Sequence, residues 1–170
     1  MKKGMKLFLG SGFSVLAKNI ENKKKKEYNE FLTNKFCIDK LSGDAEKYKV
    51  LNNLNFKSIF TTNIDNLINK IYENSNNYYL NDVTIRGPKF NERMAIDYIP
   101  LHGSVLYPER GYNFNVINVG SESNNILFQR LKIEVEEIPI LFWGYSLSDN
   151  NVINAIFSNP NWKKTILKNG

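Results

Sequence analysis

The chain has 170 residues, 42% of them apolar, which is enough to bury one hydrophobic core but short for two, so we expect a single domain over residues 1–170. No apolar run approaches the ~20 residues of a membrane-spanning helix, and we expect no membrane partner. One cysteine and one histidine exclude an internal disulfide and a structural zinc site of Cys and His ligands, so no metal is expected.

The net charge of +6 is concentrated at the N-terminal end. Residues 1–26 hold eight lysines against one acid, Glu21, and the rest of the chain is close to neutral. The run Lys23–Lys26 would suit a nucleic acid or a phosphate, but such runs are more often a solvated face. We therefore do not expect nucleic acid as a partner.

The first predicted element is a strand, Met5–Leu9, which runs into the glycine turn Gly10–Ser14 and a helix start. The same opening also has the pattern of a secretory signal, with early lysines, an apolar centre and a small-residue cleavage site at 15–17. The Gly-Ser-Gly triplet interrupts that apolar centre, and motifs further along need a first strand here. We expect the strand and a cytoplasmic protein; a secreted protein that loses its first 17 residues is the alternative.

Helical and extended patterns then alternate. Apolar residues at helical spacing predict helices over 28–36 and 48–54, the second behind the cap candidates Ser42 and Asp44. The run Lys57–Asn63 predicts a buried strand, and Asp65 is placed to cap the next helix. One face of that helix carries Leu67, Ile68, Ile71 and Tyr72.

The second half of the chain repeats this alternation. We expect a strand over Ile96–Ser104, a half-buried strand over Asn113–Val119, a helix through Ile126, Leu127, Leu131 and Val135, a strand that stops at Gly144, and a helix over Asn150–Phe157. This order predicts an α/β fold with a mostly parallel sheet covered on both faces. In such folds the ligand binds beyond the carboxyl ends of the strands.

Four polar clusters fall at these predicted strand ends: Gly10–Ser14, Thr61–Asp65, His102–Ser104 and Gly144–Asp149. A strand followed by Gly-Ser-Gly and a helix suits a phosphate, because glycine lets the backbone approach and free amides at a helix start point at the anion. The dinucleotide fingerprint of dehydrogenases is disfavoured, since its third glycine is replaced by Val15 and the region about 20 residues on is lysine-rich.

The motifs "LGSGFS", "TTNIDNLI", "PLHGS" and "FWGYSLSD", in this order and at these strand ends, resemble the sirtuin superfamily. The resemblance spans residues 5–157 and is closest to the sirtuin-like domains of bacterial antiphage defence proteins, which hydrolyse NAD. It implies a Rossmann-like three-layer core, His102 as catalytic base and Asn63 as the residue that orients the nucleophile. It also implies NAD as substrate, bound by Gly10, Ser11, Gly12, Ser14, Thr62, Asp65, Gly144 and Ser146.

The chemistry of these side chains agrees with those roles. Cleaving a nicotinamide–ribose bond builds positive charge on the sugar, and the site needs a base near a ribose hydroxyl or a water. Histidine, with an ordinary pKa of ~6.5, is suited to accept that proton. The Asn63 amide both donates and accepts, so it can hold a water, and Asp65 can accept from an amide such as that of nicotinamide. Each also has a structural alternative, because Asp65 is a good helix cap and a lone histidine is usually structural.

Three departures from the sirtuin pattern narrow the activity that we expect. Residues 15–26 lack the Gly-Ile-Pro-Asp-Phe-Arg segment that covers nicotinamide in deacylases, and the 41 positions between His102 and Gly144 lack the four cysteines of the zinc-binding small domain. The chain also ends soon after the last motif, so the adenine side is either incomplete or completed by another chain.

We therefore expect an NAD hydrolase that yields nicotinamide and ADP-ribose or cyclic ADP-ribose, rather than a protein deacylase. Because depletion of NAD harms the cell, the resemblance further implies an antiphage defence effector controlled by a homo-oligomer or by a partner protein. The alternative is a catalytically reduced module that binds NAD or ADP-ribose, or that only assembles with a partner.

Overall fold

The computed structural model describes residues 5–9, 25–88, 92–112, 122–137, 139–146 and 150–157. Its described strands form one five-stranded sheet in the order β3-β4-β2-β1-β5, and neighbouring strands are parallel. The α/β fold with a parallel sheet is thus confirmed. The strands are β1 (Met5–Leu9), β2 (Phe56–Thr61), β3 (Tyr79–Asp82), β4 (Ala95–Pro100) and β5 (Ile140–Trp143).

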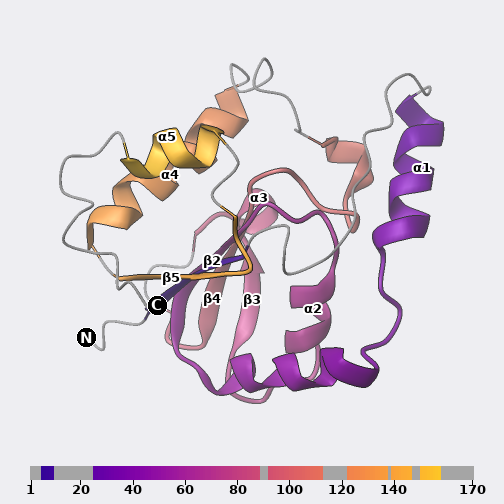
Figure 1. Cartoon of the computed structure of the whole chain (residues 1–170), viewed down its shortest axis with the longest axis horizontal. Helices are drawn as coiled ribbons and strands as arrows, with labels where there is room; N and C mark the ends of the chain where they lie inside the picture. The colour runs from indigo at the N-terminus through magenta and orange to yellow at the C-terminus, as the bar shows by residue number, and fades with distance from the viewer. Residues whose placement is uncertain are drawn as a thin grey trace.

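Helices cover both faces of the sheet (Figure 1). They are α1 (Lys25–Phe36), η2 (Gly43–Asn53), α2 (Leu67–Tyr72), α3 (Val83–Arg86), η3 (Pro108–Arg110), α4 (Glu122–Glu137) and α5 (Asn150–Phe157). Figure 1 shows α4 and α5 together on one side of the strands and α2 on the other, which gives the three layers expected. None of the helices in the described ranges is both long and apolar enough to cross a membrane.

Two hydrophobic cores lie on opposite faces of the same strands, because successive side chains of a strand point to opposite sides. Leu7, Ile59 and Tyr98 stand in register on three neighbouring strands and pack with α2 and η2. The next residue of each strand, Phe8, Phe60 and Ile99, faces α4 and α5. Each fully buried side chain of this size contributes roughly 1.5–3 kcal/mol, so the central strands are held from both sides.

The chain reverses its direction of winding at β1. From β1 it passes through β2 to the β4 and β3 side of the sheet, and it then crosses back to place β5 on the other side of β1. Such a switch point is where ligands bind in open parallel sheets, beyond the carboxyl ends of the strands. The fold therefore makes the edge at the ends of β1 and its neighbours the candidate place for a ligand.

The predicted helix over 48–54 proved to be part of the 3-10 helix η2. The apolar residues of this segment, Tyr48, Leu51 and Leu54, recur every three residues, which is the period of a 3-10 helix. Ser42 precedes η2 but makes no side-chain cap hydrogen bond. The α-helical period was therefore wrong for this segment, although a helix forms there.

Other boundaries also differ from the prediction. Strand β2 ends at Thr61 rather than Asn63, and β4 ends at Pro100 rather than Ser104. Strand β3 and helix α3 were not predicted, because β3 has only four residues and two of them are Asn and Asp, which are depleted in strands. The predicted strand Asn113–Val119 and the glycine turn Gly10–Ser14 lie outside the described residues.

Candidate functional site

The four strands that precede the candidate clusters end level with one another. Pro100 of β4 is in register with Thr61 of β2, Thr61 with Leu9 of β1, and Leu9 with Trp143 of β5. All four clusters begin within two residues of this row, while β3, at the far edge of the sheet, carries none of them. The structure therefore brings the four strand ends that precede these motifs to one edge of the sheet.

The loop after β2 turns back on itself and buries its polar side chains. The backbone amide of Asn63 donates to Thr61 Oγ1 over 2.9 Å, and the amide of Leu67 donates to Asp65 Oδ1 over 3.0 Å. Asn63 is 8% exposed and Asp65 6% exposed. The predicted capping bond of Asp65 is thus present, although Asn66 occupies the formal N-cap position of α2. Thr62 is half-buried in the same loop.

The loop after β4, which carries His102, is joined to the β2 loop by backbone hydrogen bonds. The amide of Leu101 donates to Thr61 O and the amide of Val105 donates to Ile64 O, both over 2.8 Å. These bonds lie on either side of His102 in the sequence. The two loops are therefore held as one unit, with Asn63 buried and His102 half-buried.

Glycine is required directly after His102. Gly103 has a φ of +93°, a backbone conformation that residues with a Cβ rarely adopt. A Cβ here would lie 2.8 Å from the backbone oxygen of Gly111. The chain therefore folds tightly back toward η3 at this point. That close approach sets the direction in which the backbone leaves His102.

Helix α1 packs over both loops. Leu32 of α1 forms a buried cluster with Ile64 of the β2 loop and Val105 of the β4 loop. Asn29 Nδ2 also donates to the backbone oxygen of Pro108 over 2.8 Å. Apolar packing and a directed hydrogen bond together hold α1 at the edge of the sheet where the candidate clusters lie.

Sequence reasoning missed Asn66, which ties the end of α1 to the same edge. Its Oδ1 accepts from the amide of Ile38 over 2.7 Å, and its Nδ2 donates to the oxygen of Ile38 over 3.0 Å. Asn66 is 2% exposed, so the pair is shielded from water. Only its place within "TTNIDN" could have drawn attention to it, since an asparagine that pairs with distant backbone leaves no periodic pattern.

On the α2 side of this edge, burial raises the pKa of two neighbouring side chains. The pKa of the Tyr98 phenol lies well above its ordinary value, first because the ring is buried and also because Asp65 and Asp82 carry negative charge nearby. Burial likewise raises the pKa of Asp82, although its hydrogen bonds from Thr84 and the charges of two nearby arginines act in the opposite direction. A carboxylate oxygen such as that of Asp65 can accept a hydrogen bond from a ligand amide.

The structure describes only some of the remaining predicted site residues. Gly144 has a φ of +63° and, like Ser146, is exposed just beyond β5. The Tyr145 ring between them lies 4.6 Å from the Phe8 ring of β1, which ties this loop to the central strand. The other predicted phosphate-binding residues, Gly10, Ser11, Gly12 and Ser14, lie outside the described residues. Over the residues that the structure does describe, no group of His, Cys, Asp and Glu side chains is placed to hold a metal ion.

A comparison with protein families adds an independent finding. Residues 57–160 match the model of a family described as SIR2-like domain. The match covers more than half of the chain and includes Asn63, His102 and Gly144, whereas the glycine turn Gly10–Ser14 lies before it. A search among curated proteins found no match.

Proposed function

This chain belongs to the SIR2-like domain family, and on that premise we propose that it hydrolyses NAD at the bond between nicotinamide and ribose. Domains of this family use NAD. The observation that carries the proposal is the joining of the Asn63 and His102 loops at the ends of neighbouring strands, through the bond from Leu101 to Thr61. A buried amide and a half-buried imidazole at one edge are suited to bind and deprotonate a water.

In the proposed reaction, a water oxygen forms a bond to the anomeric carbon of the ribose. The carbon–nitrogen bond to nicotinamide breaks, and its electron pair neutralises the positive charge of the pyridine ring. His102 accepts the proton of the attacking water, and Asn63 orients that water. The products are nicotinamide and ADP-ribose; attack by a group of the same NAD molecule instead of water would give the cyclic product.

The binding roles follow the position of each loop. Asp65, in the buried loop after β2, accepts from the carboxamide of nicotinamide. Gly144 and Ser146, beyond β5, contact the phosphates and the adenosine ribose. We assign Gly10, Ser11, Gly12 and Ser14 to the diphosphate on the sequence motif, and Thr62, next to Asn63, to the NAD-binding loop after β2.

We extend the proposal to regulation: the activity depends on a homo-oligomer or a partner protein, as suits an antiphage defence effector that depletes its own cell of NAD. The resemblance of the four motifs to antiphage proteins supports this role. Size-exclusion chromatography with light scattering, run beside the activity assay, tests it. A monomer with full activity would contradict this part of the proposal alone.

The test of the reaction is release of nicotinamide from NAD, followed by liquid chromatography. We expect His102→Ala to lower kcat by about 10²–10⁴, the usual contribution of a general base. Asn63→Ala should lower kcat by about 10²–10³, as the loss of an oriented polar group does. The matched control is Asn55→Ala, at an exposed asparagine just before the opposite end of β2, which should keep full activity.

Two outcomes would contradict the proposal. Turnover that survives His102→Ala would exclude His102 as the base. NAD binding without nicotinamide release, in every oligomeric state and with candidate partners present, would exclude hydrolysis and favour a binding module. Calorimetric titration with NAD separates this second outcome from a protein that binds no NAD.

A further inference from the structure

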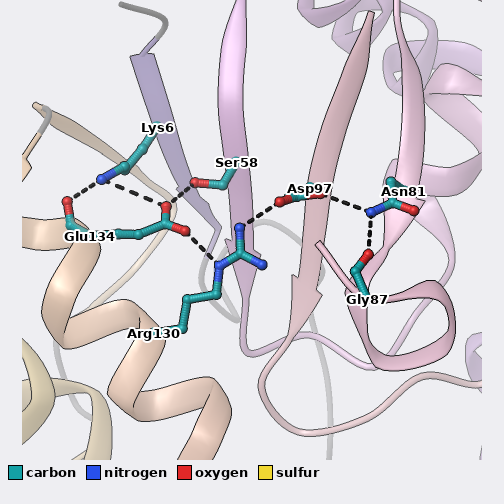
Figure 2. Close-up of polar contacts among 7 residues, drawn as sticks. All are labelled: Lys6, Ser58, Asn81, Gly87, Asp97, Arg130 and Glu134. Carbon is teal, nitrogen blue, oxygen red and sulfur yellow. Dashed lines mark hydrogen bonds and ion pairs between the residues drawn. The ribbon is translucent and has the colours of Figure 1, made fainter. Parts of the chain in front are cut away.

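A chain of buried polar side chains crosses the sheet on its α4 face (Figure 2). Lys6, Ser58, Asp97 and Asn81 stand in register on four neighbouring strands, and the first three each lie three residues before the strand end at the candidate site. Arg130 and Glu134 of α4 lie over this row. We call these six residues the α4 charge network: Lys6, Ser58, Asn81, Asp97, Arg130 and Glu134.

Every charge in the network has an oppositely charged neighbour. Arg130 donates from one terminal nitrogen to Asp97 Oδ2 over 2.5 Å and from Nε to Glu134 Oε1 over 2.6 Å. Glu134 Oε2 accepts from Ser58 Oγ over 2.6 Å and lies 3.6 Å from Lys6 Nζ. Two positive and two negative charges therefore cancel within one buried group.

The network continues to the far edge of the sheet. Asn81 Nδ2 of β3 donates to Asp97 Oδ1 over 2.8 Å and to the backbone oxygen of Gly87, just after α3, over 2.7 Å. At the other end, Lys6 Nζ donates to the backbone oxygen of Glu134. Figure 2 shows this continuous path from β1 through α4 to β3.

Apolar packing would hold α4 at a smaller energetic cost. The inward face of α4 already buries Phe128, Leu131 and Val135. Buried ion pairs often contribute no more to the free energy of unfolding than apolar side chains of the same volume, because the charges lose their hydration. Hydrogen bonds and ion pairs with a fixed geometry allow only one rotation and one axial position of the helix, a restriction that apolar contacts do not impose. The planar fork of Arg130, which bridges two carboxylates, makes that restriction strict.

This restriction bears on the candidate site through the strands. Ser58 and Asp97 lie five residues before Asn63 and His102, and Lys6 lies four before Gly10. Helix α4 ends at Glu137, and the amide of Lys6 donates to the oxygen of Pro139, just before β5 begins at Ile140. β5 is an edge strand of the described sheet and pairs only with β1, so Lys6 contacts both the end of α4 and the start of the strand that leads to the Gly144 loop.

We infer that Arg130 and Glu134 are positioning residues of the NAD site, which set the register of β1, β2 and β4 and the placement of β5, and so hold the loops of His102, Asn63 and Gly144 in one arrangement. This inference rests on the proposed function. A one-residue slip would move a loop by about 3.3 Å along its strand. A misplacement of even ~1 Å at reacting groups can cost ~10²-fold in rate.

The experiment neutralises the network at nearly constant side-chain size, with Lys6→Met, Asp97→Asn, Arg130→Met and Glu134→Gln combined. We expect a folded protein by circular dichroism, a lower kcat together with a KM for NAD raised at least tenfold, and faster amide hydrogen exchange at residues 62–66, 101–107 and 144–146. The matched control is Leu131→Met, a volume-conserving change on the same face of α4, which should leave both readouts unchanged.

A purely structural role would lower the folded fraction and leave the KM of the folded molecules and the exchange of these loops unchanged, and that result would overturn the inference. If the combined variant does not fold, Arg130→Lys decides by the same two readouts, because it keeps the charge but loses the planar fork. If the wild-type protein releases no nicotinamide, the proposed function fails and loop exchange alone decides this inference.

Discussion

Two regions of the molecule use buried polar groups in different ways. In the α4 charge network the charged side chains bond mainly to one another, and their charges cancel within the group. At the carboxyl edge, the side chains of Thr61, Asp65 and Asn66 are joined to backbone amides and carbonyls of the loops. The first arrangement holds elements against one another, whereas the second shapes loops and leaves His102 half-exposed beside them. Buried polar groups therefore serve the packing of helices and strands in one region and the shape of loops in the other.

The largest expected effect comes from breaking the network at one point. Arg130→Met leaves Asp97 and Glu134 buried without their common partner, and we expect the free energy of unfolding to fall by about 3–4 kcal/mol. Urea denaturation followed by tryptophan fluorescence measures this loss. The control is Lys47→Met, which removes an exposed pair with Asp44 and should cause no measurable change. Equal losses in the two variants would mean that the network is not held by its charges.

Gly103→Ala tests the tight turn in the other region. The positive φ and the close approach to Gly111 O should cost about 2–3 kcal/mol and should also lower turnover, because the backbone must shift beside His102. Gly87→Ala is the matched control, since its φ is also positive, at +71°, but an added Cβ would meet nothing within 4 Å. Thermal unfolding and nicotinamide release are both measured. A loss of activity as large for Gly87→Ala would show that strain alone, rather than the position next to His102, is responsible.

Asn66→Ala should remove the tie between α1 and the β2 loop and lower stability by about 1–2 kcal/mol, because the amide and the carbonyl of Ile38 both lose their partner. Asn66→Asp keeps an acceptor for the amide but buries a carboxylate against the carbonyl of Ile38, so its loss at pH 7 should be larger. Chemical denaturation ranks the two variants. If Asp proves less costly than Ala, the bond accepted from the Ile38 amide is the one that matters.

The smallest effect concerns Asp82, which accepts from the amide of Thr84 at the start of α3. Since burial raises its pKa above the ordinary 3.8, the folded state binds this proton more tightly than the unfolded chain. The stability gained from that proton is present below pH 3.8 and is lost as the pH rises through the raised pKa. Asp82→Asn keeps an acceptor for Thr84 and removes the ionisation. We expect its Tm to exceed that of the wild type at pH 7 by on the order of 2 °C, with no advantage at pH 3.5, as measured by calorimetry.

Much of the fold follows from local patterns in the chain. The buried faces of β1, β2, β4 and α2 were predicted because apolar residues recur there with the period of a strand or a helix. Strand β3 was not predicted because two of its residues are polar. Asn81 bonds to Asp97 of β4, and Asp82 caps α3. Similarly, η2 was predicted with the wrong period because a spacing of three fits both kinds of helix.

The candidate site likewise contains residues that local sequence patterns reveal and residues that they do not. Each of the glycine, asparagine and histidine motifs is contiguous in the sequence, so their order and their places after predicted strands indicate a SIR2-like domain from the sequence alone. By contrast, Asn66 and Arg130 act on residues 28 and 33 positions away. No local pattern marks such partners, because side-chain hydrogen bonds between distant segments obey no periodicity.

By itself the sequence determined which segments form β1, β2, β4 and β5, which of their faces are apolar and, through its motifs, the family. Only the tertiary structure decided that the four strand ends stand level, that the loops of Asn63 and His102 are joined through Thr61 and Ile64, and that α4 is held by charges. The physical reason is that hydrophobic burial depends on the period of single residues along the chain. Directed bonds depend instead on where two distant atoms meet after the strands have paired.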